Sequence, residues 1–163
     1  MTDSHSPAEV GYDVSDGVAR ITLDAPGRRN ALSVEMADEI IAATRLAEAD
    51  SAVGAIVITG GAHFCSGAVR EVLAAAGKDP AEEEAYHNLE TIYRAFTTIG
   101  EIGLPTIAAV RGAAVGAGLN LALATDLRVV STTARLLPGF AQIGIHPGGG
   151  HFTLLNRLAG REA

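Results

Sequence analysis

One stretch decides the fold expected of this 163-residue chain: PTIAAVRGAAVGAGLN, residues 105–120. Its first part, Thr106–Val110, is a short unbroken apolar run, which is typical of a strand buried on both faces of a parallel sheet. Its second part has glycine at 112, 116 and 118 and leads into a helix of small residues that extends to about Ala124. The stretch therefore predicts a strand, a tight turn and a helix. Glycines in such a turn let backbone N–H groups at the helix N-terminus approach a ligand oxygen.

The rest of the chain also alternates between strands and helices. Residues 10–14 and 18–23 alternate apolar and polar side chains around an Asp16-Gly17 turn, which predicts a β-hairpin. Parallel strands joined by helices need crossover connections, so we expect a single α/β domain over residues 1–163. The other expected elements are a helix capped by Ser33 and ending near Asp50, strands at 55–59 and 126–130, helices at 69–76, 82–103 and 152–158, and a break at 77–80.

Composition limits the function. Twelve Lys and Arg against nineteen Asp and Glu give a formal net charge of −7, which excludes a nucleic-acid binder that works through bulk positive charge. Arg111, Gly112 and Asp126 interrupt the most hydrophobic part, so no run can span a bilayer, and residues 1–7 have no signal-peptide core. The single cysteine, Cys65, cannot form an intrachain disulfide and is expected to be buried, and no Cys/His cluster suggests a metal. We expect a cytoplasmic protein with neither nucleic acid nor membrane as a partner.

A second segment of small residues, Phe64-Cys65-Ser66-Gly67-Ala68, follows the strand expected at 55–59. Because both small-residue turns come at the carboxyl end of a strand, they could converge on one carbonyl oxygen. Backbone donors arranged in this way form an oxyanion hole. The alternative interpretation of the residues alone is that small side chains only permit close packing of helix and sheet.

The glycines at 112, 116 and 118 also have the spacing of the nicotinamide site in short-chain dehydrogenases. In that family the motif follows the first strand, whereas here more than a hundred residues precede it. Residues 136–140 contain no acidic residue to hold a ribose hydroxyl, and no tyrosine is followed four residues later by lysine. We therefore reject the dehydrogenase interpretation.

Five motifs in this order resemble the crotonase, or enoyl-CoA hydratase/isomerase, family. They are PGRRNAL at 26–32, AIVITG at 55–60, FCSGA at 64–68, the glycine segment at 105–118 and DLRV at 126–129, and the likeness continues through IGIHPGGG at 143–150. The resemblance implies a spiral fold of repeated ββα units, a homotrimer or hexamer, and an acyl- or enoyl-CoA thioester as substrate, with no metal, flavin or nicotinamide cofactor. Family members continue with further helices past the point that matches Gly160, so we expect this C-terminal helical part to be missing from the sequence.

The resemblance also assigns roles to individual residues. The two oxyanion-hole donors fall on the backbone N–H groups of Ala68 and Ala117, which would polarise the thioester carbonyl and stabilise its enolate. Arg28 or Arg29 would reach a CoA phosphate, unless each is only a solvated loop charge. The residues expected to line the CoA site are Ala68, Val69, Arg70, Glu71, Gly116, Gly118 and Gly148.

The chain departs from the hydratase pattern at both catalytic glutamates. Asn120 and Phe140 stand where the family has the glutamates that activate water and deliver a proton. An amide can hold a water but is not a useful base, and a phenyl ring can do neither. His146 is the first candidate for a replacement base, because an imidazole titrates near neutral pH. Weaker candidates are His151, Glu71 and Asp126.

Two functions therefore stay open. The first is an enolate-stabilising enzyme of acyl-CoA metabolism with one base. The second is a non-catalytic acyl-CoA-binding protein, which the loss of both glutamates favours. A purely structural subunit ranks third.

Overall fold

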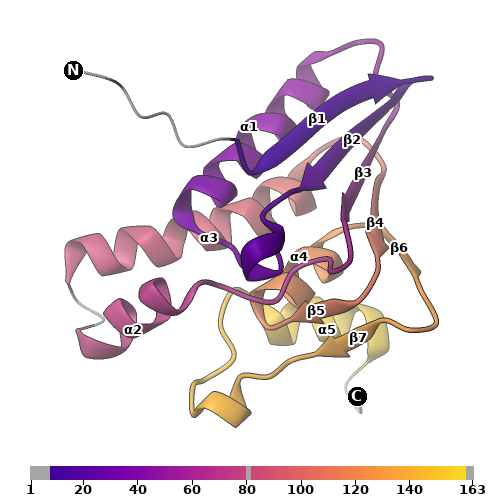
Figure 1. Cartoon of the computed structure of the whole chain (residues 1–163). Coiled ribbons are helices and arrows are strands. Elements are labelled where there is room, and N and C mark those ends of the chain that lie inside the picture. The colour runs from indigo at the N-terminus through magenta and orange to yellow at the C-terminus, as the bar shows by residue number, and fades with distance from the viewer. Residues whose placement is uncertain (1–7, 80–81, 161–163) are drawn as a thin grey trace.

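The computed structural model describes residues 8–79 and 82–160. Its centre is a five-stranded sheet with the strand order β1-β2-β3-β4-β6 (Figure 1). The first pair is antiparallel and every later pair is parallel, which confirms the expected crossovers. The strands of this sheet are β1 (Val10–Ser15), β2 (Val18–Leu23), β3 (Ala55–Gly60), β4 (Thr106–Val110) and β6 (Leu127–Val130).

The hairpin of β1 and β2 forms where the sequence predicts it. Asp16 and Gly17 both have positive φ, 51° and 77°, the backbone conformation of a two-residue turn whose twist matches that of the strands. Ser15 pairs with Val18 across the turn. Alternate side chains of β2 are buried, so one face of the hairpin packs on the core.

Five helices pack against or below this sheet in the described part of the chain: α1 (Val34–Ala49), α2 (Arg70–Lys78), α3 (Glu83–Glu101), α4 (Ala117–Ala124) and α5 (His151–Ala159). Ser33 caps α1, since its hydroxyl accepts the N–H of Met36 at 3.1 Å. Helices α1 and α3 pack against each other on one side of the sheet (Figure 1). Helix α2 continues through Gly77, which a final turn tolerates, so the break expected at 77–80 begins later than predicted.

A second, two-stranded parallel sheet is made by β5 (Ala113–Val115) and β7 (Arg135–Leu137). Sequence analysis placed both segments in loops. This was wrong because each strand has only three residues, too few for an alternating pattern to show. With these strands included, the chain reads β1-β2-α1, β4-β5-α4 and β6-β7-α5. The repeated ββα units expected of the fold are confirmed.

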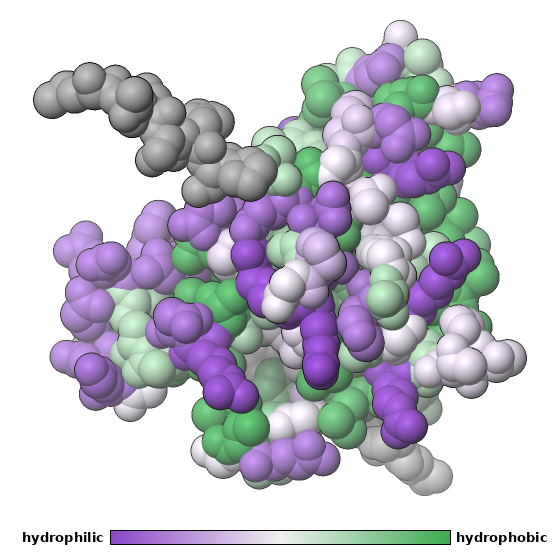
Figure 2. Space-filling model, in the orientation of Figure 1, coloured by the Kyte–Doolittle hydropathy of each residue, from purple (hydrophilic) through white to green (hydrophobic). Residues whose placement is uncertain are grey.

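Among residues 8–79 and 82–160, no helix combines the length and the apolar character that a membrane crossing requires. Hydrophilic side chains cover much of the face seen in Figure 2. Large apolar side chains are nevertheless exposed on β6, where Leu127 is 60% and Val129 is 66% exposed. The outer edge of the five-stranded sheet is therefore an apolar surface.

Candidate active site

The two small-residue turns lie side by side because the chain before one of them pairs with the strand before the other. The N–H of Cys65 donates to the carbonyl of Ala113 at 3.0 Å, and the N–H of Val115 donates to the carbonyl of Cys65 at 3.0 Å. Residues 66–68 and 116–118 leave this pairing together. The convergence anticipated from the sequence is thus a product of the short strand β5.

Gly118 keeps the two turns in contact. A Cβ built on Gly118 would lie 2.7 Å from both Cβ and Sγ of Cys65, and closer still to the Cys65 carbonyl oxygen. The missing side chain therefore lets α4 pack directly on Cys65. Gly118 was expected to line the CoA site, but the structure places it in this packing contact and not on the cavity wall.

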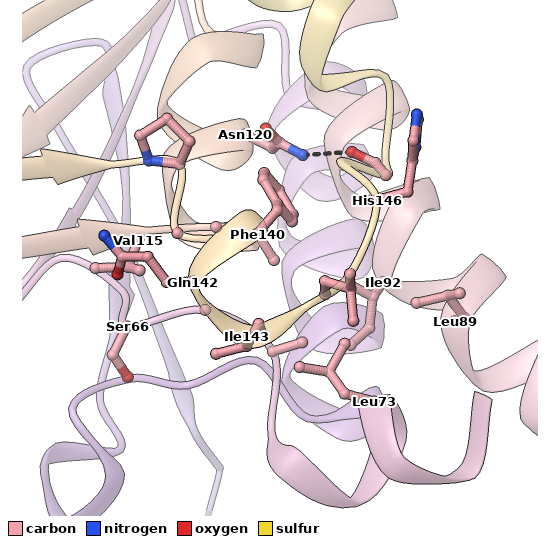
Figure 3. Close-up of a pocket in the computed structure, with 18 of the residues that line it drawn as sticks. Ser66, Leu73, Leu89, Ile92, Val115, Asn120, Phe140, Gln142, Ile143 and His146 are labelled. Atoms are coloured by element: carbon pink, nitrogen blue, oxygen red, sulfur yellow. Dashed lines mark hydrogen bonds between the residues drawn. The ribbon is translucent and has the colours of Figure 1, made fainter. Parts of the chain in front are cut away.

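A cavity of about 270 Å³ opens where the turns meet. One end is apolar: in Figure 3, Leu73, Ile92 and Ile143 point toward one another. Asn120 and Phe140 lie toward the other end. The predicted site residues on the cavity wall are Ala68, Arg70, Gly116, Ala117, Asn120, Phe140, His146 and Gly148. An adjacent groove is lined by Arg28, Ala31, Ser66, Ala68, Val69, Arg70 and Glu71.

The backbone N–H groups of Ala68 and Ala117 are unengaged donors on this wall. Ala117 is the first residue of α4, so its N–H has no partner within the helix. Within residues 8–79 and 82–160, neither N–H donates a hydrogen bond to the protein. The positive end of the helix dipole lies at Ala117 as well. The arrangement suits an oxygen that gains negative charge.

Asn120 is 1% exposed and its amide is held on both sides. Its Nδ2 donates to the carbonyl of Gly148 at 3.0 Å, the dashed line of Figure 3. Its Oδ1 lies 2.8 Å from Nδ1 of His151. Because a carbonyl oxygen can only accept, the amide nitrogen must face Gly148, and its oxygen must then accept the proton on Nδ1 of His151.

His151 is buried between aromatic rings, with an exposure of 3%. Its ring centroid lies 5.1 Å from that of Phe140 and 6.0 Å from that of Phe152. Burial lowers the pKa of His151, which favours the neutral imidazole at neutral pH. The residue does not belong to the cavity wall, since Asn120 and Phe140 lie between.

His146 belongs to the cavity wall but is exposed. Figure 3 shows its imidazole directed away from Ile92 and Ile143. The ring contacts Phe152 edge-on, with 5.8 Å between the centroids. A base at this position would act from the rim of the cavity.

Tyr93, on α3, is a wall residue that sequence analysis treated only as part of an apolar helix face. Its hydroxyl packs so closely on Gly148 that a Cβ there would overlap it. Burial raises the pKa of Tyr93, so the hydroxyl keeps its proton at neutral pH. The spacing with Leu89 and Ile92 reveals a buried helix face, but no local pattern reveals that this face borders a cavity.

The two arginines considered for a CoA phosphate have different surroundings. Arg28 forms an ion pair with Glu9, which also accepts the hydroxyl of Ser33 at 3.0 Å. The hydrogen-bonded guanidinium lowers the pKa of Glu9, so the charge of Arg28 is compensated. Arg29 is exposed, in the left-handed conformation with φ 53°.

Two further candidates have structural roles. Asp126 Oδ2 accepts the N–H of Thr106 at 2.9 Å and its hydroxyl at 2.8 Å, which ties the start of β6 to β4 away from the cavity. Cys65 is fully buried, and burial raises the pKa of its thiol to about 12, so it is not a nucleophile.

The role of Asp126 predicts a dependence of stability on pH. The hydrogen bonds from Thr106 lower the pKa of the Asp126 carboxyl in the folded state. The stabilisation is therefore complete above the unfolded pKa of about 3.9 and is lost as the pH falls through the lower folded value. Urea denaturation should show wild type more stable than Asp126→Asn at pH 6, with the gap closing below about pH 4. A gap independent of pH would show that the charge of Asp126 is irrelevant.

The comparison with protein families agrees with this architecture. The family model described as enoyl-CoA hydratase/isomerase matches residues 13–163, and the chain belongs to this family. A probable enoyl-CoA hydratase of Mycobacterium tuberculosis, EchA14, is 47% identical over 150 residues, which cover 91% of this chain and 57% of that protein. A 4-chlorobenzoyl coenzyme A dehalogenase of Arthrobacter is 35% identical, with 96% of this chain and 57% of that protein covered.

Solved structures give the same result. An enoyl-CoA hydratase from Polaromonas superposes with a TM-score of 0.86 at 34% identity, covering 94% of this chain and 60% of that one. An enoyl-CoA hydratase from Bacillus halodurans gives a TM-score of 0.87 at 28% identity, covering 94% and 62%. The crotonase fold is therefore confirmed, and the chain spans less than two thirds of these relatives.

Proposed function

We propose that the chain binds an acyl- or enoyl-CoA thioester and stabilises its enolate through the N–H groups of Ala68 and Ala117. The observation that carries this proposal is the pair of unengaged backbone donors on one cavity wall, one of them at a helix N-terminus. Donors fixed in this way stabilise a developing oxyanion by about 3 kcal/mol each.

The rest of the thioester fits the two spaces next to these donors. The apolar end of the cavity, with Leu73, Ile92 and Ile143, would take the acyl chain. The adjacent groove, with Val69, Arg70 and Glu71, would take part of the CoA moiety. The thioester is the substrate, so the proposed reaction uses no separate cofactor. We also propose a cytoplasmic homotrimer or hexamer, as family membership suggests.

In the catalytic form of the proposal, His146 is the base. It would take the proton from the α-carbon, while the electron pair of that C–H bond moves to the carbonyl oxygen held by Ala68 and Ala117. The proton would return to the acyl chain, which is isomerase-type chemistry. Of the imidazoles in the described part of the chain, only that of His146 belongs to the cavity wall.

The second candidate, a non-catalytic acyl-CoA binder, has support of its own. No Asp or Glu of residues 8–79 and 82–160 lines the cavity. His146 is directed outward and the amide of Asn120 is already engaged (Figure 3). Such a protein would bind the thioester without turning it over.

One assay separates these candidates. Loss of the conjugated enoyl-thioester absorbance is followed with crotonyl-CoA and a longer enoyl-CoA, and acyl-CoA binding is measured by calorimetry in the same buffer. Turnover supports the enzyme, and binding without turnover of these or isomeric enoyl thioesters supports the binder. The absence of both signals would contradict the proposed function and promote a structural role.

His146→Gln tests the base directly. If His146 transfers the proton, kcat falls at least about tenfold while acyl-CoA affinity stays within about twofold, because the oxyanion donors are untouched. The matched control is His87→Gln, an exposed histidine on α3. Unchanged turnover in His146→Gln would assign the proton transfer to another group.

A further inference from the structure

We infer that Asn120 is a specificity-determining hydrogen-bond donor for an oxygen on the acyl chain, and that His151 is the positioning residue that fixes this role. The inference rests on the proposed function, since it concerns the same cavity. It starts from the buried hydrogen-bond chain in which His151 donates to Asn120 and Asn120 donates to Gly148.

The chain of bonds leaves the Asn120 amide with one orientation. A flipped amide would turn its oxygen toward the carbonyl of Gly148 and its nitrogen toward the protonated Nδ1 of His151, which loses both bonds. Burying such unpaired groups costs free energy, so the flipped state is disfavoured. A leucine or phenylalanine in place of His151 would remove the donor that enforces this orientation.

With this orientation, one donor of Asn120 is left over. An amide nitrogen carries two hydrogens, and only one of them is used, on the carbonyl of Gly148. The second has no acceptor within residues 8–79 and 82–160, although Asn120 belongs to the cavity wall. In Figure 3 the amide nitrogen is turned toward the loop of His146, and the oxygen lies on the side away from Ile143.

The spacing along α4 indicates where an acceptor would lie. Ala117 and Asn120 are three residues apart, so they share one face of the helix, with roughly 5–6 Å between their Cβ atoms. A thioester whose carbonyl oxygen binds the N–H of Ala117 can extend to the Asn120 amide within a few bonds. The acceptor would therefore be a hydroxyl or keto oxygen on the β-carbon of the acyl group. A saturated, unsubstituted chain offers no such oxygen.

Calorimetry with two ligands that differ in this oxygen tests the inference. Wild type should bind 3-hydroxybutyryl-CoA about tenfold more tightly than butyryl-CoA, the effect of one well-placed hydrogen bond. Asn120→Leu, which is nearly isosteric, should abolish the preference and leave butyryl-CoA affinity within about twofold of wild type. Asn156→Leu, an exposed asparagine on α5, is the matched control.

His151 is tested by a conservative and a non-conservative change. His151→Leu should lose most of the preference because the amide is free to flip. His151→Asn should retain it, since its amide nitrogen can donate from the place of Nδ1. Circular dichroism checks each fold, and if Asn120→Leu does not fold, the two His151 variants carry the test.

The outcomes are distinct. Equal affinity of wild type for the two ligands, or equal weakening of both in Asn120→Leu, overturns the inference while the proposed function stands. Equal ligand preference in His151→Leu and wild type overturns the role of His151. Failure of wild type to bind either ligand contradicts the proposed function itself.

Discussion

Ala117→Pro should lower the affinity for acetoacetyl-CoA, a ligand that ionises to an enolate, by about a hundredfold. The substitution removes one backbone N–H, and the loss of one oxyanion donor typically costs about 3 kcal/mol. Ala117 is the first residue of α4, a position where proline is well tolerated because its N–H has no helical partner. Gly116 before it has no Cβ to clash with the proline ring. Calorimetry and the absorbance of the bound enolate report the change.

Ala117→Gly is the matched control, because it alters the same residue but keeps the N–H. Its enolate absorbance and its affinity for acetoacetyl-CoA should stay close to those of wild type. Circular dichroism should show both variants folded. If Ala117→Pro folds and still binds acetoacetyl-CoA with the wild-type enolate band, the N–H of Ala117 is not an oxyanion donor.

Gly118→Ala should lower the free energy of unfolding by about 3 kcal/mol, at the upper end of what overpacking costs. The added methyl would overlap the Cys65 carbonyl and lie 2.7 Å from the Cys65 side chain. Both neighbours belong to a buried backbone segment paired with β5, so neither can move aside as a flexible side chain does. Urea denaturation monitored by circular dichroism measures the loss.

Gly103→Ala provides the comparison, because no atom lies within 4 Å of a Cβ built there. We expect its stability to stay within about 0.5 kcal/mol of wild type. Equal stability of the two variants would show that α4 can shift away from Cys65 at little cost, and that Gly118 is not needed to hold the turns together.

Much of the fold follows from local patterns. The Asp16-Gly17 turn, the Ser33 cap and the apolar run Thr106–Val110 each specify their element through nearby residues. The strand-turn-helix at residues 105–120 likewise indicates a donor at a helix N-terminus. These features could be predicted because the interactions that create them span only a few positions in the chain.

The rest of the site depends on contacts between distant residues. Asn120 meets His151 thirty-one residues away, and Arg28 meets Glu9 nineteen residues away. No local pattern distinguishes the rim histidine His146 from the buried His151, because both lie in or next to the same glycine-rich loop. Strand β5 is visible only once its partners are known, since three residues have no period.

The pairing of β5 with Cys65 on one side and with β7 on the other also sets how the site can be lost. This small sheet contributes few residues, whereas the five-stranded sheet and α1 and α3 form most of the core. Short, peripheral elements open in local fluctuations that need less free energy than global unfolding. An opening confined to β5 and β7 would separate Ala68 from Ala117 while the main sheet stays folded. The ligand-binding geometry therefore belongs to a less stable cooperative unit than the fold, and a bound thioester that bridges both donors would stabilise that unit first.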